Sequence, residues 1–325
     1  MQLALADPSP QVARLGIAAL GRNPIPDGVP LLLRELHKAV VGQTGVPTRS
    51  IKTALVHYPI GELGPFTAWM EHANPRFRFL AVDTVREICR KSADQPRSAF
   101  PAALRQWFLV KSVNDPSADV RARGATVIGW FQDAEAGAQL RRLLQDENEF
   151  VRLHAVRACA DPCSPDLLED VLCRVTDTHW RVREAAVRTL GAFPGAGRQA
   201  LERLFLSTTD RYASEQIADE IQRSGLVAHI IPLLASPNGE KRQAFEVCAK
   251  MARLGMDSFL IEDLAEAASS AVRPPLLRAL APSGSPQLVA ALRRIAGNQM
   301  DPLRAQAQEF LRAHLTGSAA WAGGD

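Results

Sequence analysis

The sequence contains no apolar run approaching the roughly eighteen residues that a helix needs to cross a bilayer. The segment from Met1 to Asp7 has no basic leader and is too short in apolar residues for a secretory signal peptide. The five cysteines are odd in number and irregularly spaced, which argues against a disulfide framework and fits a reducing compartment. These absences predict a cytoplasmic protein without membrane insertion.

Aromatic residues are also scarce, and neither sign of charge is in large excess. Aromatics make up 6% of the chain, which fits the small-residue interfaces of stacked helices better than a large globular interior. The net charge of +3 is close to balance, whereas binding to a polynucleotide or an anionic membrane calls for a clustered basic excess. Nucleic acid is therefore a disfavoured partner. Hydrophobic residues, at 46% of the chain, suffice for a long, thin core.

The sequence does contain one pattern written three times between Asp115 and Gly191. Each copy starts with an Asp, reaches a Val-Arg pair five residues later and continues into an Ala-rich helical segment. The three Asp residues, Asp115, Asp146 and Asp177, are 31 residues apart. A fixed period of this length with a helix start in every copy is typical of an α-solenoid, so we predict an all-α superhelix of stacked antiparallel hairpins.

We predict a single array of hairpins over residues 1–315. Its first part, 1–114, is irregular, and its second part, 115–315, keeps the period more closely. Residues 316–325 are small and polar, so we expect a disordered tail.

The irregular part begins within a repeat, so we expect either that its start is a domain boundary or that its first helix is truncated and its exposed face needs a cap. Val12 is predicted to lie in the buried stripe of the helix that follows. Loops near Gly42 and Ser92 interrupt the period, and such insertions are where repeat proteins often add binding specificity.

The repeat from Asp177 to Gly191 resembles the bacterial HEAT repeat, in particular the short version first associated with phycobilisome lyases. The resemblance rests on the Asp, the Val-Arg pair and the following Ala186, Leu190 and Gly191. It covers most of the chain and implies a solenoid of helical hairpins. Ala13 and Ser214 depart from it at the Arg position. HEAT arrays serve scaffolding, transport, cofactor attachment and repair, so the resemblance constrains the fold more than the function.

The recurrent Asp and Arg residues have a structural interpretation. An Asp just before a helix can accept hydrogen bonds from free backbone N–H groups, and the Arg fork suits pairing with a neighbouring carboxylate. We therefore predict that this row ties repeats together, and an anion-binding stripe is the functional alternative. The predicted structural ladder comprises Arg78, Asp115, Arg121, Asp146, Arg152, Asp177, Arg183, Arg242, Arg273 and Arg304.

Four possible metal ligands, His154, Cys159, Cys163 and Cys173, fall within twenty residues of one another. Cys159, however, takes the place that Leu190 holds in the next repeat, which predicts an apolar environment where a free Cys is a common small hydrophobe. No pair has the tight C-x-x-C spacing of a structural zinc site. We therefore predict no metal and no cofactor.

Catalytic signatures are missing as well. None of the seven His residues is followed by Glu, the pair that recurs at the di-iron centre of deoxyhypusine hydroxylase, an enzyme of similar architecture. No Ser-His-Asp constellation or Gly-rich phosphate loop stands in a recognisable context. We predict no catalytic residues.

The groove side of each second helix is predicted at positions two and six after the buried anchor. This prediction places on the groove a row of mixed charge that includes Thr53, His57, Ala122, Leu153, Arg157, Glu184, Arg188, Glu215, Asp219 and Glu309. A mixed row disfavours a polynucleotide track. The candidate partner-binding residues are Arg157, Glu184, Arg188, Asp219 and Trp180. Trp180 also has a packing interpretation, as an apolar staple just before a helix, and Trp130 is likewise expected in the core.

The favoured function is a non-catalytic scaffold or regulatory adaptor that binds a partner protein along the groove. A bilin lyase or isomerase of the phycobilisome-lyase type is the enzymatic alternative implied by the resemblance. A HEAT-like DNA-binding or DNA-repair protein is the second alternative.

Overall fold

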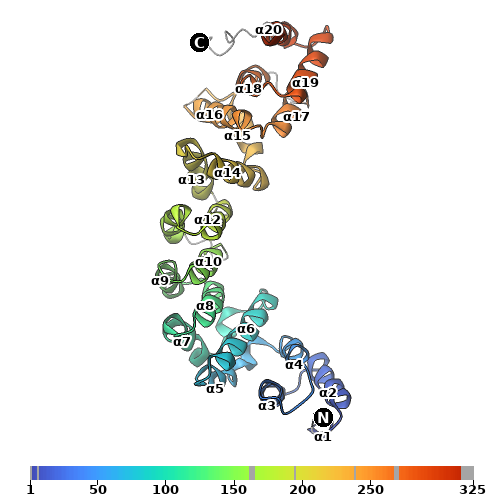
Figure 1. Cartoon of the computed structure of the whole chain (residues 1–325), viewed down its shortest axis with the longest axis vertical. Coiled ribbons are helices and arrows are strands. Elements are labelled where there is room, and N and C mark those ends of the chain that lie inside the picture. Colours follow the sequence, from blue (N-terminus) through green and yellow to red (C-terminus); the bar gives the residue numbers. More distant parts are fainter. Residues whose placement is uncertain are drawn as a thin grey trace. The chain divides into compact units, whose positions relative to one another are not determined.

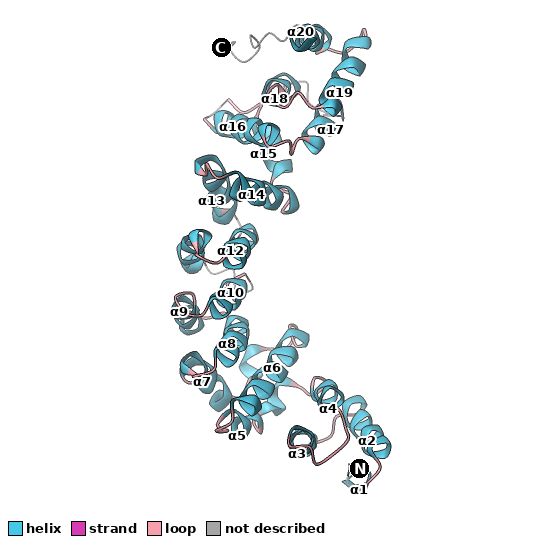
Figure 2. Cartoon of the chain, viewed as in Figure 1, coloured by secondary structure: helices cyan, strands magenta, loops and turns pink. Residues whose placement is uncertain are grey.

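A computed structural model describes residues 2–5, 7–160, 165–193, 195–237, 239–266 and 271–315. The helices of these residues follow one another as hairpins (Figure 1). Helices and loops account for all of the described segments, which contain no strand (Figure 2). The predicted α-solenoid is thereby confirmed. The predicted tail, 316–325, and Cys163 lie outside the described residues.

The chain divides into two compact units, Met1–Thr189 and Leu190–Asp325. The α-helices that lie in or begin in the first unit are α1 (Gln2–Leu5), α2 (Pro10–Arg22), α3 (Gly28–Val40), α4 (Thr48–Leu55), α5 (Phe66–Met70), α6 (Pro75–Lys91), α7 (Ala102–Val110), α8 (Ala118–Phe131), α9 (Ala134–Leu143), α10 (Glu149–Ala158), α11 (Leu168–Leu172) and α12 (Trp180–Ala192). The short 3-10 helices are η1 (Ile60–Leu63), η2 (Arg97–Ala99), η3 (Ser112–Asn114), η4 (Pro165–Leu167) and η5 (Cys173–Thr176).

From α2 to α10, the second helix of one hairpin packs on the second helix of the next. Helix α2 contacts α4, α4 contacts α6, and α8 lies between α6 and α10. The anchor residues Ile51, Val120 and Val151 are fully buried in these interfaces, and Phe77 is 5% exposed. Stacking thus turns one buried stripe per helix into a continuous core.

Close helix packing overturns three expectations for individual residues. Val12 is 37% exposed, and Ala13 takes the buried position, because α1 covers α2 at Gly16, where an added Cβ would lie 3.2 Å from that of Ala4. Ala122 and Leu153 are buried rather than facing a groove, because α8 packs tightly between its neighbours.

The second unit repeats the hairpin scheme. Its α-helices are α13 (Ala196–Ser207), α14 (Arg211–Arg223), α15 (Val227–Leu233), α16 (Glu240–Arg253), α17 (Ser258–Glu266), α18 (Arg273–Leu280), α19 (Pro286–Gly297) and α20 (Arg304–Leu315). Within this unit α16 packs on α18, and α17 packs on both α18 and α19. The core side chains Ile217, Leu276 and Leu292 are fully buried.

Candidate functional site

The ladder residues of the first unit meet as forked ion pairs between consecutive hairpins. Arg121 Nε and Nη2 donate to the two carboxylate oxygens of Asp146 at 2.8 and 2.9 Å. Arg152 holds Asp177 in the same way at 2.8 and 2.9 Å. Arg78 holds Asp115 at 2.6 and 2.8 Å. Each pair is bidentate, so it fixes an angle as well as a distance between hairpins.

Each Arg also reaches back to the loop of its own hairpin. Arg121 Nη1 donates to the backbone carbonyl of Asp115, Arg152 Nη1 to that of Asp146, and Arg183 Nη1 to that of Asp177. Because each Asp gives its carboxylate to one Arg and its carbonyl to the next, the contacts form one chain of hydrogen bonds along the array.

The Asp carboxylates shape the turns that precede the second helices. Asp146 Oδ1 accepts a hydrogen bond from the Asn148 amide at 2.9 Å, and Asp177 Oδ1 accepts one from the His179 amide at 2.9 Å. Asn148 then caps α10 by accepting from the Phe150 amide. The carboxylate therefore orders the turn that leads into the helix, and the N-cap is a separate residue.

These contacts lower the pKa of both carboxyl groups. Burial would raise the pKa of Asp146, but hydrogen bonds from Arg121 and the Asn148 amide, with the charges of Arg121 and Arg152, outweigh it. The pKa of Asp177 is lowered in the same way, against burial, chiefly by Arg152 and the His179 amide. Both groups are consequently ionised throughout the neutral range.

The remaining predicted ladder residues differ from this arrangement. Arg273 forks Asp301 at 2.9 and 3.2 Å. Arg304 is exposed and donates at 3.3 Å to the carbonyl of Ala296. Arg242 is exposed and, among the described residues, forms no ion pair. The Arg position therefore carries a forked pair only where a carboxylate is within its reach.

The solvent-facing side of the second helices in the first unit, which we call the second-helix face, carries a charged cluster. Asp83 on α6 pairs with Lys52 of α4 and with Arg86 at 3.1 Å, and Arg123 Nε of α8 lies 3.7 Å from it. Burial would raise the pKa of Asp83, but its hydrogen bonds and charge contacts with Lys52 and Arg86 lower it. Acidic and basic groups largely compensate each other here.

His154 of α10 lies beside this cluster. Its ring packs edge-on against Phe150 with centroids 4.5 Å apart, and Arg123 lies over the same Phe150 ring. Burial, followed by the charges of Arg123 and Arg157, lowers the pKa of His154 to about 4. The imidazole is therefore neutral at physiological pH and acts as a packing residue.

The predicted partner-binding residues are all accessible to some degree. Arg157 of α10 and Asp219 of α14 are exposed. Arg188 is exposed and pairs with half-buried Glu184 at 2.6 Å along α12. Trp180 is 50% exposed, with the Arg181 guanidinium 5.4 Å from the centre of its ring. Trp180 therefore does not lie in the core, and its role as a staple at the start of α12 stays a prediction, whereas Trp130, 5% exposed, lies in the core as expected.

The cysteines do not assemble a metal site in the described part of the chain. Cys89, Cys159 and Cys248 are buried, and burial raises the pKa of each thiol to about 12. Cys173 is exposed. No three His, Cys, Asp or Glu side chains gather closely enough to hold a metal ion among the residues described. Nor is any described helix both long enough and apolar enough to span a membrane.

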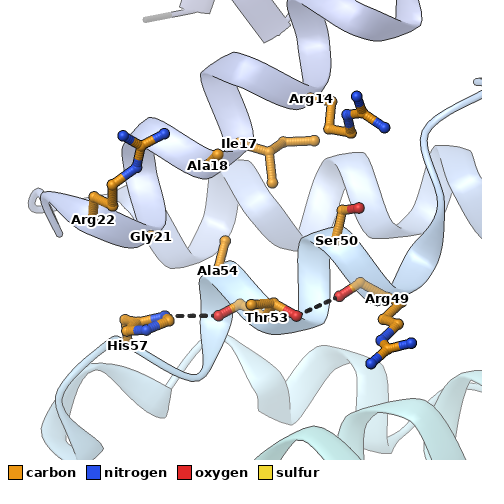
Figure 3. Close-up of a pocket in the computed structure, with 10 residues that line it drawn as sticks. All are labelled: Arg14, Ile17, Ala18, Gly21, Arg22, Arg49, Ser50, Thr53, Ala54 and His57. Atoms are coloured by element: carbon orange, nitrogen blue, oxygen red, sulfur yellow. Dashed lines mark hydrogen bonds between the residues drawn. The ribbon is translucent and has the colours of Figure 1, made fainter.

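A hollow between α2 and α4 was not anticipated from the sequence. It measures about 460 Å³, and Figure 3 shows ten residues that line it, among them Arg14, Arg22, Arg49 and His57. The signal for it was the spacing of Arg14, Ala18 and Arg22, four residues apart on one helix face. Thr53 and His57 do lie on this side, as the groove rule predicted.

The geometry defines a class of protein, an α-solenoid whose hairpins are joined by Arg–Asp forks. Residues 107–172 and 151–222 match the family model for HEAT repeats, so this stretch of the chain consists of HEAT repeats. The resemblance drawn from Asp115 to Gly191 is confirmed.

The chain is similar in sequence to one known protein over part of its length, and it aligns with solved structures over most of its length. The bilin biosynthesis protein MpeU of Synechococcus sp. strain WH8020 is 32% identical over 99 residues, which cover 30% of this chain and 31% of MpeU. The match thus spans about a third of that relative's length. Among solved structures, Kap95p in a complex with RanGDP aligns at a TM-score of 0.48 and 12% identity over 99% of this chain and 52% of that chain. The CpcE–CpcF complex of phycocyanin lyase from Nostoc sp. PCC7120 aligns at a TM-score of 0.31 and 18% identity, over 67% of this chain and 90% of that chain.

Proposed function

We propose that this chain is a non-catalytic solenoid that binds a partner protein through the second-helix face and the helix starts beside it. The observation that carries the proposal is Trp180, which is 50% exposed in a chain that buries Trp107 and Trp130 to 5% exposure. Exposed tryptophan is a frequent anchor of protein interfaces, and charged residues at the rim add specificity. Arg157, Glu184 and Arg188 supply such charges.

The forked ladder supports this function by holding the face rigid. Bidentate pairs fix the angle between consecutive hairpins, so the exposed side chains between the Arg–Asp pairs keep a constant distance from one hairpin to the next. A preorganised surface loses less conformational freedom when it binds. The Arg and Asp side chains of the ladder are already engaged in contacts within the chain, so the residues that lie between these pairs are the ones that bind the partner.

The proposal is tested by affinity purification from the native host with wild-type chain, Trp180→Ala and Met300→Ala. Met300 is 88% exposed and serves as the matched control, because it also removes an exposed apolar side chain. A stoichiometric partner should be retained by wild type and Met300→Ala and lost or reduced at least about tenfold with Trp180→Ala. Absence of any stoichiometric partner would reject the proposal.

A second candidate function is bilin attachment, which the similarity to MpeU favours. It predicts that the chain, expressed together with a bilin, copurifies with a visible chromophore or transfers one to an acceptor protein. A colourless product with no acceptor modification would exclude this candidate and leave the partner-binding proposal intact.

A further inference from the structure

The hollow between α2 and α4 has two basic ends and an apolar floor. Arg14 and Arg49 lie at one end, and Arg22 and His57 lie at the other (Figure 3). Arg14 and Arg22 are eight residues apart on α2, which places their Cα atoms about 12 Å apart along the helix axis. The floor between the ends is made of Ile17, Ala18, Gly21 and Ala54.

The floor forms where the two helices approach closely. A Cβ added at Gly21 would lie 2.8 Å from Ala54 Cα, so only glycine permits this packing. The wall of α4 adds hydroxyl groups. Thr53 Oγ1 donates to the carbonyl of Arg49, which leaves its oxygen lone pairs able to accept, and Ser50 stands one turn away.

No carboxylate lines this hollow, and none of Arg14, Arg22 and Arg49 has an ion-pair partner within the described residues. Some arginines on other helices of the chain are compensated along their own helix. Arg86 pairs with Asp83, and Arg188 pairs with Glu184. Three guanidinium groups without an acid around one depression give a local positive field that attracts an anionic ligand.

The spacing selects the kind of anion. In an extended peptide, side chains four residues apart point to the same side and lie about 13 Å apart, and the residue midway between them points the same way. Two carboxylates at this spacing reach both basic ends, while the middle side chain meets the apolar floor. A single small anion reaches one end only.

A polynucleotide fits less well, because its phosphates require a basic track that continues along the face. The next second helix, α6, instead presents Asp83 and Glu87, which pair with Arg86 and Arg90. The positive field is therefore local and matches a short segment.

We propose that this hollow is the docking site for an extended acidic segment of the partner protein, with two carboxylate side chains four residues apart around an apolar residue. Arg14 and Arg49 bind the first carboxylate, Arg22 binds the second, and the middle side chain covers Ala18 and Ala54. The inference rests on the proposed protein-binding function and names the chemistry that its partner presents.

The test uses the full chain and a fluorescein-labelled peptide, Gly-Glu-Ser-Val-Ser-Glu-Gly, in fluorescence anisotropy at low salt. Binding should saturate below about 1 mM protein, and peptides with both Glu replaced by Gln, or with the two Glu adjacent, should bind at least about tenfold more weakly. Raising the salt should weaken binding, because exposed charges are screened. No binding by wild type, or equal binding of the Gln peptide, overturns the proposal.

Matched variants separate the site from the overall charge. Arg14→Gln/Arg22→Gln/Arg49→Gln should weaken binding about tenfold or more, whereas the control with the same loss of charge should stay within about twofold. That control replaces the exposed arginines Arg203, Arg278 and Arg294 with Gln. Equal loss in both triple variants overturns the site. Circular dichroism of both verifies folding, which substitution of exposed arginines should preserve.

A charge swap gives an independent readout. Arg14→Glu/Arg22→Glu should bind the peptide in which both Glu are Lys and should lose the original peptide. Failure of this exchange, or displacement of the peptide by pyrophosphate at equal affinity, contradicts a segment docked across both ends.

The native partner distinguishes failure of this inference from failure of the proposed function. A partner captured by wild type and lost by the Gln triple variant supports the docking site. A partner retained equally by the triple variant overturns the docking site and leaves the protein-binding function standing, whereas absence of any partner rejects both.

Discussion

The two units of the chain use the same repeat position differently. In the first unit Arg78, Arg121 and Arg152 each fork an Asp of the next hairpin, and the pairs lie largely buried. In the second unit Arg273 forms such a pair, whereas Arg242 is exposed. The recurrence of Arg alone therefore does not determine its energetic role. That role is determined by whether a carboxylate lies within reach of the Arg and whether the resulting pair is buried.

Breaking a rung should have the largest effect. Arg152→Met leaves Asp177, whose side chain is 3% exposed, without its fork, and loss of one partner of a buried pair costs about 3 kcal/mol or more of unfolding free energy. Arg242→Met removes an exposed side chain and should change stability by less than about 0.5 kcal/mol. Urea unfolding followed by far-UV circular dichroism compares the two.

A second substitution identifies the cause. Arg152→Met/Asp177→Asn removes the buried Asp177 charge that has lost its fork and keeps only Arg174 Nη1 at 3.8 Å. The side-chain oxygen of residue 177 can still accept from the His179 amide. This variant should recover part of the lost stability. Equal midpoints for Arg152→Met and Arg242→Met would show that the rung contributes nothing.

Part of this contrast could be read from the sequence, through a 25-residue spacing that holds for two forked pairs and not for Arg78–Asp115 or Arg273–Asp301. Arg121 and Arg152 are each followed by an Asp 25 residues later, whereas the residue 25 after Arg183 is Thr208 and the residue 25 after Arg242 is Ala267. The period predicted hairpins and buried anchors because both follow local helical spacing. A stricter version of the ladder prediction would have required the carboxylate as well as the Arg.

The basic hollow, the exposure of Trp180 and the burial of Ala122 and Leu153 were less predictable from the sequence. Burial of Ala122 and Leu153 depends on how closely α8 approaches α6 and α10, and single-helix periodicity does not report interhelical distance. The absence of acids around Arg14, Arg22 and Arg49 depends likewise on which residues of α4 face α2. These features belong to packing between repeats.

Gly129 and Gly191, which occupy the same position in two of the repeats, should give an effect of intermediate size. A Cβ at Gly129 of the first unit would lie 2.7 Å from the backbone oxygen of Ala158, whereas one at Gly191 of the second unit would meet Glu220 Oε1, the end of a flexible side chain. Gly129→Ala should therefore cost about 2 kcal/mol, because overpacked helices must separate. Gly191→Ala should cost less than about 1 kcal/mol.

A third glycine provides the control for these two. Gly137 lies inside α9 with no atom within 4 Å of an added Cβ. Gly137→Ala should raise stability by about 0.5 to 1 kcal/mol through helix propensity. The result that would contradict the packing argument is a similar gain for Gly129→Ala in the same urea experiment.

Acidification tests how much of the stabilisation by these Arg–Asp pairs depends on the charge of the carboxylates. Asp146 and Asp177 have folded-state pKa values below their ordinary value, so the unfolded chain binds protons more readily than the folded one as pH falls. Their stabilisation is complete above the unfolded pKa near 4 and is lost as pH falls through the folded pKa. Asp146→Asn/Asp177→Asn should therefore differ most from wild type at neutral pH and least at about pH 2.

The second unit again supplies the comparison, because Asp301 also has a lowered pKa, held against burial by Arg273 and the Leu303 amide. Asp301→Asn should flatten the acid dependence less than the double variant does, since it removes one such carboxyl group and not two. Urea midpoints at neutral pH and at about pH 2 measure both. If the double variant stays as far below wild type in acid as at neutral pH, its loss reflects the changed turns and not the ionised rungs, and the forked pairs would then be geometric guides with little electrostatic contribution to stability.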